Sequence, residues 1–420
     1  MTNILTRLWA AFALAMTLAA PAFGQVGSPT TVIDARMAGP GTCTAATANG
    51  TTDDSVALNC KLSSFGASGG VLFIPAGNYY VANTLLVPQN VSVRGTGYGS
   101  VLQQKHTFVG NLIRLGTFSE LRDIQLTQEQ PPLAAGWSPY LDYDYQIRVF
   151  GYSVNISNVM LLSPTRGIII RSENQNPDGS GPVVFVGKAR LSNIRGQPLV
   201  SGIYMDGISD VMRAEDIHFW PWWSQDSRVQ DWVRGHAVAL ESYRNDNPFF
   251  NNIFTFGYYR GLSFGTSPPH TPPFPIVGST SRATVSGFDC DFCYFGVYIN
   301  GNNTNGLQLD GPIIYSSSDG QPQIYIDADH VSIMISRLDS VASLTNVVRI
   351  LGDYDSVVVG NSMIRSWNVS AHGYPAFEVV AGTTGSVISL SNILYGVGSG
   401  APVYGGTTVV ATAVTNAPGL

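Results

Sequence analysis

Apolar residues alternate with other side chains in short blocks that recur along the chain at a regular spacing. Alternation with period two is typical of a β-strand with one buried face. Each block begins with Gly and follows an Asn or a Gly by nine residues, and the blocks form two pairs whose members are thirty-five residues apart. We therefore expect a repeated unit of two short strands with a tight bend at the Gly. The four copies are Asn158 with residues 167–170, Asn193 with 202–205, Asn252 with 261–264, and Gly287 with 296–299.

Similar blocks continue further along the chain, at residues 324–326, 348–350 and 377–379, where the spacing shortens to 24 and 29 residues. In these units the strands recur while the connecting segments vary in length. Units of this kind, which bury a core shared with their neighbours, are typical of a solenoid. No helical period separates these strands. The pattern therefore predicts an all-β parallel β-helix that forms one continuous domain, with rungs about 4.8 Å apart.

The first part of the sequence predicts a leader and a cap. Residues 1–24 contain the apolar run 8–20 after a single Arg, which is typical of a secretory signal peptide. A membrane anchor is the alternative, but the run is too short to cross a bilayer of about 30 Å. Asp53 or Asp54 is a suitable N-cap for a helix that extends to Gly66, and a helix there would cover the open end of the coil.

We divide the chain into four regions on this basis. Residues 1–24 are the signal peptide, 25–105 are the N-terminal cap and the first rungs, and 106–395 are the parallel β-helix. Residues 396–420 are rich in Gly, Ala, Thr and Val, which indicates a C-terminal strand or a loose tail.

Residues 69–79, GGVLFIPAGNY, and 91–97, VSVRGTG, resemble the opening of the pectate lyase-like superfamily when taken together with Asp53-Asp54-Ser55. In that superfamily an acidic capping helix leads into such a strand and then into the first rungs. The resemblance implies a single-stranded right-handed parallel β-helix with an N-terminal capping helix, acting on polysaccharide or binding it. Rhamnogalacturonase-like hydrolases, lyases, epimerases and phage tailspikes share this opening. The resemblance therefore leaves the reaction open, and we take no site residue from it.

Charge and cysteine content narrow the class of partner and the compartment. The net charge is −6, charged residues make up 12% of the chain, and there are three lysines and no basic run. Phosphate recognition needs a cationic surface, so nucleic acid is not expected as a partner. Four cysteines in an exported chain predict a disulfide between Cys43 and Cys60, with Cys290 and Cys293 as further candidates. A zinc site or free thiols are the alternatives for the second pair.

Four long insertions interrupt the coil, and such loops in a solenoid commonly carry function along one flank, where they can wall a groove. One of them is rich in tryptophan, and the flat face of an indole ring suits the C–H face of a sugar. A hydrophobic loop folded onto the coil is the alternative. The insertions are residues 131–145, 172–187, 219–234 and 265–282. The expected sugar-binding residues are Trp220, Trp222, Trp223, Trp232, Arg234, His236 and Arg244.

Carboxylates beside this loop are candidates for general acid and base. The alternation places Asp216 and Asp289 on the outer face, two rungs or about 9.6 Å apart. That distance is close to the carboxylate separation of inverting glycosidases. A stacked amide ladder is the alternative for Asp216, which lies in the same column as Asn158, Asn193 and Asn252. The catalytic candidates are Asp216, Glu215, Asp289, Asp291 and His218.

A lyase would need a base beside a uronic carboxylate and a cation that stabilises the enolate. The sequence has no recognisable acidic calcium cluster, which places the lyase hypothesis second. The N-T-D and G-H-G triplets of polygalacturonase-like hydrolases are also absent. The cation candidates are Arg213, Arg234, Arg244 and Arg260, and the base candidates are His218, His236 and Tyr243.

The leading hypothesis is a secreted protein, periplasmic or extracellular, that cleaves a polysaccharide by hydrolysis with no metal or other cofactor. A lyase or epimerase acting on uronic-acid glycans is the second hypothesis, and a non-catalytic glycan-binding surface or matrix protein is the third. We expect no membrane insertion after cleavage of the signal peptide. The sequence leaves open whether the chain forms a homo-oligomer.

Overall fold

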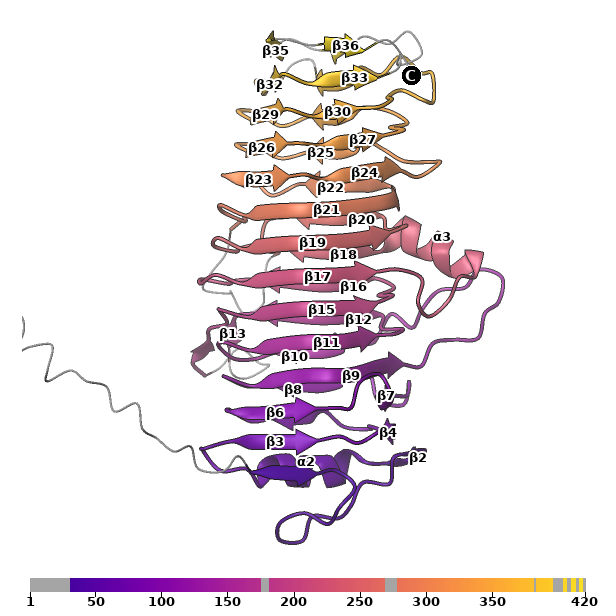
Figure 1. Cartoon of the computed structure of the whole chain (residues 1–420), viewed down its shortest axis with the longest axis vertical. Helices are drawn as coiled ribbons and strands as arrows, with labels where there is room; N and C mark the ends of the chain where they lie inside the picture. The colour runs from indigo at the N-terminus through magenta and orange to yellow at the C-terminus, as the bar shows by residue number, and fades with distance from the viewer. Residues whose placement is uncertain are drawn as a thin grey trace, which may run out of the picture.

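The computed structural model shows a parallel β-helix that rises from one end of the molecule to the other (Figure 1). The structure describes residues 31–174, 181–268, 278–380, 383–395, 403–405, 409–412 and 415–417, so the expected signal peptide lies outside the described residues. A 22-stranded sheet, here called the front sheet, and a 12-stranded sheet, the back sheet, enclose the core. In Figure 1 the front strands run from left to right, the back strands return, and the chain climbs. The coil is therefore right-handed, as expected.

The strands and helices have the following bounds. The front sheet contains β1 (Val32–Asp34), β2 (Asn49–Asp53), β3 (Gly70–Phe73), β4 (Gly77–Tyr80), β6 (Val91–Arg94), β7 (Ser100–Gln104), β9 (Glu120–Gln128), β11 (Asn155–Leu161), β15 (Arg190–Gly196), β17 (Arg213–Phe219), β19 (Phe249–Phe256), β21 (Thr284–Cys293), β23 (Leu307–Asp310), β24 (Ile313–Ser316), β26 (Ser332–Ser336), β27 (Asp339–Val341), β29 (Ser356–Gly360), β30 (Met363–Ile364), β32 (Ser386–Leu390), β33 (Ile393–Tyr395), β35 (Val409–Thr412) and β36 (Thr415–Ala417). The back sheet contains β5 (Leu85–Val87), β8 (Ile113–Leu115), β10 (Ile147–Val149), β12 (Arg166–Arg171), β16 (Ser201–Asp206), β18 (Val238–Ser242), β20 (Arg260–Phe264), β22 (Phe295–Ile299), β25 (Ile324–Ile326), β28 (Val348–Ile350), β31 (Phe377–Val379) and β34 (Tyr404–Gly405). A small hairpin joins β13 (Glu173–Asn174) to β14 (Val183–Val184), and the helices are α2 (Ser55–Ser63) and α3 (Ser227–His236).

The repeats stack in the predicted register. β11 pairs in parallel with β15, which puts Val159 beside Ile194, and β19 pairs with β21, which puts Ile253 beside Phe288. All four side chains are buried, at 1% exposure or less. Apolar side chains at equivalent positions therefore form one continuous core, which is how a solenoid stabilises units that could not fold alone.

A left-handed residue at the bend of the front sheet explains the repeated Asn. The φ angles of Asn158, Asn193, Asp216, Asn252 and Gly287 are 56°, 50°, 55°, 54° and 66°. Asn, Asp and Gly adopt this conformation more readily than other residues. The Nδ2 group of Asn193 donates to Asn158 Oδ1 at 2.9 Å, and that of Asn252 donates to Asp216 Oδ1 at 2.6 Å. The column is a stacked ladder that includes Asp216.

Helix α2 covers the lower end of the coil, as the sequence predicts (Figure 1). It begins after Asp54 at the N-cap position, although the Asp54 side chain makes no capping hydrogen bond. The Asp54 carboxylate instead accepts from the backbone N–H of Thr47 at 2.6 Å, and Asp53 accepts from the N–H of Ser55 at 2.9 Å. Both acidic side chains are therefore used in the local structure of the cap.

Both cysteine pairs form disulfides. The bond between Cys43 and Cys60 ties α2 to the loop before β2, which confirms the prediction. Cys290 and Cys293 are also bonded to each other, and their exposed fractions are 0% and 1%. This bond excludes zinc ligation by the second pair.

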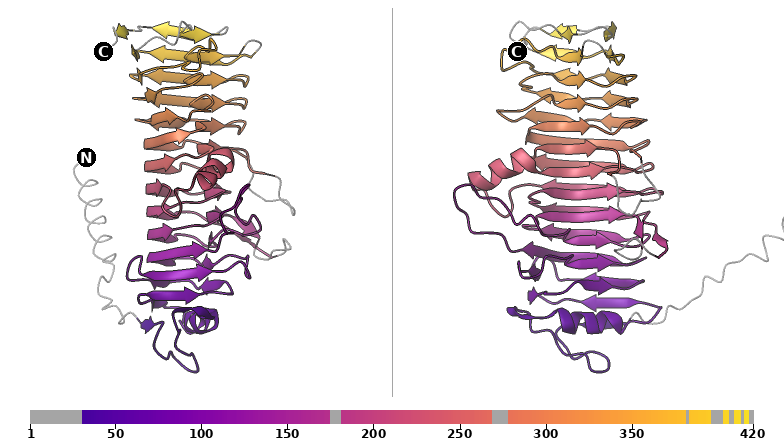
Figure 2. Two further views of the ribbon diagram at one scale, coloured as in Figure 1. Left: turned by 90° about the vertical axis from the view of Figure 1, so that its right-hand side faces the viewer. Right: turned by 180° about the vertical axis from the view of Figure 1, so that it is seen from behind.

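The described parts of the insertions lie along two edges of the back sheet rather than along one flank (Figure 2). Residues 131–145 connect β9 to β10, and residues 219–234, which include most of α3, connect β17 to β18. Residues 172–187 and 265–282 leave the opposite edge, and residues 175–180 and 269–277 within them are outside the described residues. The expectation of a single flank is wrong because long loops occur in both kinds of connection between the sheets. In the described ranges, neither helix has the length and the apolar run that crossing a bilayer requires.

Candidate functional site

Outward-facing aromatic rings form a line across the front sheet beside α3. Trp220, which directly follows β17, packs on Phe256 of β19 with ring centroids 4.4 Å apart, and it lies 6.1 Å from Phe254. Phe256 in turn contacts Phe292 of β21 at 5.4 Å. These rings come from three successive rungs, so the parallel register itself brings them together. We call Trp220, Phe254, Phe256 and Phe292 the aromatic stripe.

Asp289 and Asp291 lie beside the aromatic stripe on β21, the strand that also carries Phe292. Asp289 pairs in register with Phe254, and Asp291 pairs with Phe256. The buried Cys290 between them points into the core, so both carboxylates point outward, with Cα atoms about 6.6 Å apart at the usual rise of a strand. The sequence prediction that both lie on the outer face is therefore confirmed.

The surroundings of these carboxylates favour their neutral forms. Burial, and secondarily the charge of Asp291, raises the pKa of Asp289 to about 6, and burial also raises the pKa of Asp291. Among the described residues, the Oδ1 atom of Asp289 is buried and has no hydrogen-bond partner. A carboxyl group whose pKa is raised toward neutrality is suited to proton transfer.

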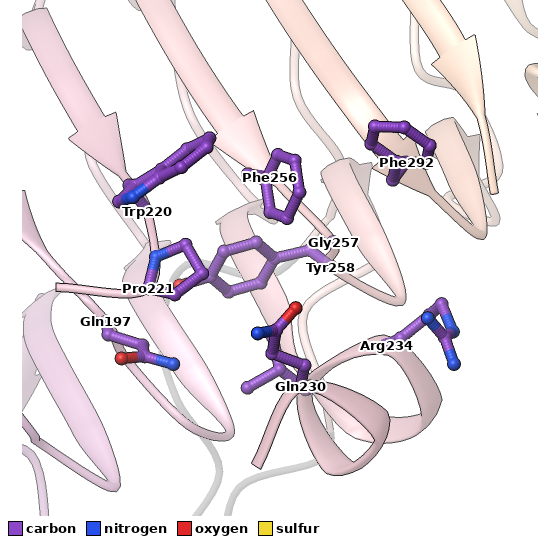
Figure 3. A pocket seen from close by; sticks show the side chains of 10 residues that line it. Gln197, Trp220, Pro221, Gln230, Arg234, Phe256, Gly257, Tyr258 and Phe292 are labelled. Carbon is purple, nitrogen blue, oxygen red and sulfur yellow. The ribbon is translucent and has the colours of Figure 1, made fainter. Parts of the chain in front are cut away.

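A cavity of about 190 Å³ lies between the aromatic stripe and α3 (Figure 3). Trp220, Phe256 and Phe292 line it from the front sheet, and Gln230 and Arg234 line it from α3. Helix α3 is held there by Val229 and Val233, which are buried, so the far wall of the cavity has a fixed position.

The remaining catalytic candidates are engaged in structural contacts. Glu215 forms an ion pair with Arg190, whose Nε donates to Glu215 Oε1 at 2.9 Å. Asp216 belongs to the ladder at the bend. His218 packs against Phe254 at 4.8 Å, and burial, with a smaller effect of Arg195, lowers the pKa of His218, so its imidazole is neutral near pH 7.

The tryptophan-rich insertion divides into packed and outward rings. Trp223 and Trp232 pack against the hydrophobic core, and Trp232 Nε1 donates to the Leu199 carbonyl at 3.0 Å. His236 stacks on Trp232 at 3.9 Å. Trp222 is 41% exposed, and Trp220 belongs to the aromatic stripe. The alternative of a hydrophobic loop folded onto the coil therefore holds for Trp223 and Trp232, and sugar binding by Trp220 and Trp222 stays a prediction.

The two arginines among the sugar-binding candidates already have carboxylate partners. Arg234 contacts Asp231 at 2.7 Å and Asp319 at 3.5 Å. Arg244 contacts Asp246 at 2.8 Å and lies beyond β18, away from the aromatic stripe. The structure does not bring Arg244 to the cavity.

A further cluster of polar and aromatic side chains lies on the outward face of the back sheet. Glu241 accepts hydrogen bonds from Ser201 Oγ at 2.6 Å and from the Tyr243 hydroxyl at 2.8 Å. Tyr204 packs on Tyr243 at 4.8 Å and on Tyr145 at 5.8 Å. Burial raises the pKa of Glu241, although its hydrogen bonds and the nearby Arg260 act in the opposite direction. We call these five residues the Glu241 cluster.

Two of the residues predicted for a lyase are found here. Tyr243 belongs to the Glu241 cluster, and Arg260 lies close enough to affect the pKa of Glu241. The Arg260 guanidinium lies over the Tyr298 ring at 3.7 Å, and its Nε has no hydrogen-bond partner within the part of the chain that the structure describes. Arg213 lies over Phe249 on the other sheet. Glu241 was missed from the sequence, although Tyr204 occupies the outward position of its repeat block, and the register places Glu241 beside it. Among the described residues, no group of His, Cys, Asp and Glu is arranged to hold a metal ion.

Comparison with known proteins shows the fold. No family model matches the chain. Over 90 residues the chain is 38% identical to the tail spike protein of Shigella phage Sf6, a match that covers 19% of this chain and 14% of that protein. PfbA, a surface adhesin of Streptococcus pneumoniae, has a TM-score of 0.58 at 11% identity, over 90% of this chain and 93% of that chain. A mutant tailspike protein of E. coli bacteriophage HK620 has a TM-score of 0.58 at 11% identity, over 88% and 67% of the two chains. The resemblance to pectate lyase-like β-helix proteins is thus confirmed at the level of the fold.

Proposed function

We propose that the protein binds a polysaccharide along the aromatic stripe and cleaves it by hydrolysis, with Asp289 and Asp291 as the acid and base. The observation that supports this most directly is the state of Asp289. Its pKa is raised to about 6, one of its oxygens has no partner among the described residues, and it lies beside Phe254. A neutral carboxyl group next to a flat apolar ring can protonate a glycosidic oxygen of a sugar held on that ring.

Asp291 is the partner carboxylate in this proposal. It lies on the same face of β21, and its position beside Phe256 places it next to the adjacent sugar unit on the stripe. In its ionised form it would activate water or attack the anomeric carbon, and the stereochemistry of the product distinguishes these two routes. Asp216 and Glu215 have no part in this mechanism because the ladder and Arg190 hold them.

Export of the chain is supported independently of the reaction. The two disulfides need an oxidising compartment, and PfbA, which shares the fold, is a surface adhesin. Residues 1–24 have the sequence pattern of a secretory signal. We therefore place the mature protein in the periplasm or outside the cell, in contact with glycans there.

A second candidate function, a lyase or epimerase acting on uronic sugars, is favoured by the Glu241 cluster. Arg260, with an unpartnered Nε among the described residues, could neutralise a uronic carboxylate, and Tyr243 could exchange a proton at the adjacent carbon. The carboxyl group of Glu241 accepts a hydrogen bond from Tyr243 and interacts with Arg260, and it disfavours a second negative charge unless it is protonated. Hydrolysis at Asp289 remains our leading proposal for this reason.

The test is product analysis of the mature chain on a panel of neutral and uronic polysaccharides. New reducing ends without an ultraviolet-absorbing double bond indicate hydrolysis, the double bond indicates elimination, and retention without turnover indicates a binding protein. Asp289→Asn and Glu241→Gln then assign the activity to one face. Activity that survives Asp289→Asn and disappears in Glu241→Gln would contradict our proposal in favour of the second.

A further inference from the structure

We propose that the cavity between α3 and the aromatic stripe is a subsite for one neutral sugar unit that carries a methyl group, as a deoxy sugar or as an acetylated one. The inference rests on the proposed function, since it names the class of substrate for the same site. It depends on the lining of the cavity, on the charges around it and on its size.

The lining of the cavity is mainly apolar. Three rings, Trp220, Phe256 and Phe292, come from successive rungs, and Val233 and Pro221 extend the same surface (Figure 3). A methyl group placed against these rings leaves water at a gain in free energy. A hydroxyl group at the same position would lose its water without a hydrogen-bond partner, which is unfavourable. The lining therefore favours a methyl group over a hydroxymethyl group.

The polar side chains of the lining are mostly occupied. Gln197 Oε1 accepts from the backbone N–H groups of Trp223 at 2.9 Å and Ser224 at 2.8 Å. The buried Tyr258 hydroxyl donates to the Pro198 carbonyl at 3.1 Å. These groups hold the walls of the cavity in place and leave it little capacity to hydrogen-bond a ligand.

Gln230 on α3 is the exception. Its Nε2 donates to the Gln225 carbonyl at 2.7 Å, and no bond to its Oε1 is formed among the described residues. This oxygen can accept one hydrogen bond from a ring hydroxyl. One acceptor beside an apolar wall suits a sugar unit with a polar edge and a methyl-bearing edge.

The charges around the cavity disfavour an acidic sugar. The guanidinium of Arg234 is the positive charge of the lining, and Asp231 and Asp319 already balance it at 2.7 Å and 3.5 Å. Asp291 pairs in register with Phe256, so a further carboxylate lies close to the same wall. A uronic acid in the cavity would have no free cation and would face this negative charge. The expected ligand is therefore neutral.

The size of the cavity indicates a single sugar unit. Its volume of about 190 Å³ is below the roughly 300–1,000 Å³ of sites for drug-sized ligands. Neighbouring units of a polysaccharide would then continue along the exposed part of the aromatic stripe, toward Asp289.

The test measures binding of simple methyl glycosides to the folded Asp289→Asn chain by NMR titration. Methyl α-L-fucoside is compared with methyl α-L-galactoside, which differs by one hydroxyl group, and methyl N-acetylglucosaminide is compared with methyl glucoside. Methyl galacturonide is the acidic probe. We expect a preference of about tenfold for a methyl-bearing member of a pair, as one group in an apolar pocket typically gives, and weaker binding of the galacturonide.

Variants locate the binding. Gln230→Trp, which fills the cavity, should abolish the preference, and Phe292→Ala, which removes a side chain that is 43% exposed, should reduce it. Phe185→Ala is the control, because Phe185 is also exposed, at 51%, and does not line the cavity. A preference for the fucoside identifies a deoxy sugar, and one for the N-acetyl sugar identifies an acetyl group.

Equal affinities within both pairs, or tighter binding of the galacturonide, would overturn the inference. Such a result would leave the proposed hydrolysis standing if Asp289→Asn still abolishes turnover. Conversely, a methyl preference in a chain that cleaves no polysaccharide would keep the subsite and remove the hydrolase.

Discussion

Asp289 and Asp291 lie two residues apart on the outward face of β21, and the charge of Asp291 adds to burial in raising the pKa of Asp289 to about 6. The two carboxylates therefore differ in protonation over part of the pH range, although they share one surface. A pair of titratable groups with separated pKa values is the arrangement from which an acid and a base can be assigned. The first two predictions follow from this relationship.

Asp289→Asn and Asp291→Asn should each lower kcat by about 10²–10⁴-fold, because each removes a proton-transfer group. Initial rates on the best polysaccharide of the panel measure this effect. Asp310→Asn is the matched control, since Asp310 on β23 forms a surface ion pair with Arg337 and such pairs contribute little to stability. A full rate for Asp289→Asn would remove this residue from the site.

The rate should fall as the pH rises above about 6, by roughly tenfold per pH unit, because Asp289 must be protonated to act as the acid. The profile of kcat/KM against pH measures the limb. Replacing Asp291 by Asn removes the neighbouring charge, so the residual activity of this variant should show the limb at lower pH. If the rate falls at the same pH in this variant as in the parent, another group controls the pH dependence.

Asp289→Asn should also change the stability in a pH-dependent way. The folded pKa of Asp289 is raised above its value of 3.8 in a free side chain, so its contribution to stability is present at low pH and is lost as the pH rises through about 6. The Asn variant does not titrate. It should therefore match the parent near pH 4 and exceed it by about 1 kcal/mol near pH 7, after allowance for partial solvent exposure. Urea unfolding at the two pH values measures this, and a difference independent of pH would contradict it.

The ladder at the bend should depend on both conformation and hydrogen bonding. Asn193→Ala should cost about 2 kcal/mol in the free energy of unfolding, because Ala disfavours a φ of 50° and the bond to Asn158 is lost. Asn193→Gly should cost about half as much, since Gly adopts this conformation easily. Denaturant unfolding of both variants provides the comparison. Equal losses would show that the left-handed conformation is unimportant there.

The two disulfides should differ in their effect on activity. Replacing Cys43 and Cys60 by Ala should cost about 3 kcal/mol of stability, and replacing Cys290 and Cys293 about 2 kcal/mol, because the second bond closes a shorter loop. The second pair encloses Asp291 and Phe292, where the pairing of β21 with β24 is irregular. Only removal of the Cys290–Cys293 disulfide should therefore lower kcat. The rate is measured at a temperature where both variants are folded. An equal loss of kcat in both variants would contradict this local role.

The sequence determined that the chain forms a coil whose strands stack in parallel. Alternating apolar residues such as Ile203 and Met205 indicate a strand with one buried face, and the spacing from Asn158 to Asn193 gives the length of one turn of the coil. Both patterns are local, so they can be recognised in one sequence. The same logic placed Asp289 and Asp291 on the outer face. It also identified the column at the bend, because a left-handed φ leaves a local preference for Asn, Asp or Gly.

Only the tertiary structure decided which outward residues meet and how their charges behave. Tyr145 reaches Tyr204 and Ser201 because the connections between the sheets differ in length, and no local pattern encodes that distance. Glu241 was overlooked for the same reason. The raised pKa of Asp289 depends on burial by neighbouring rungs, and the sequence cannot supply it because desolvation is a property of the packed structure.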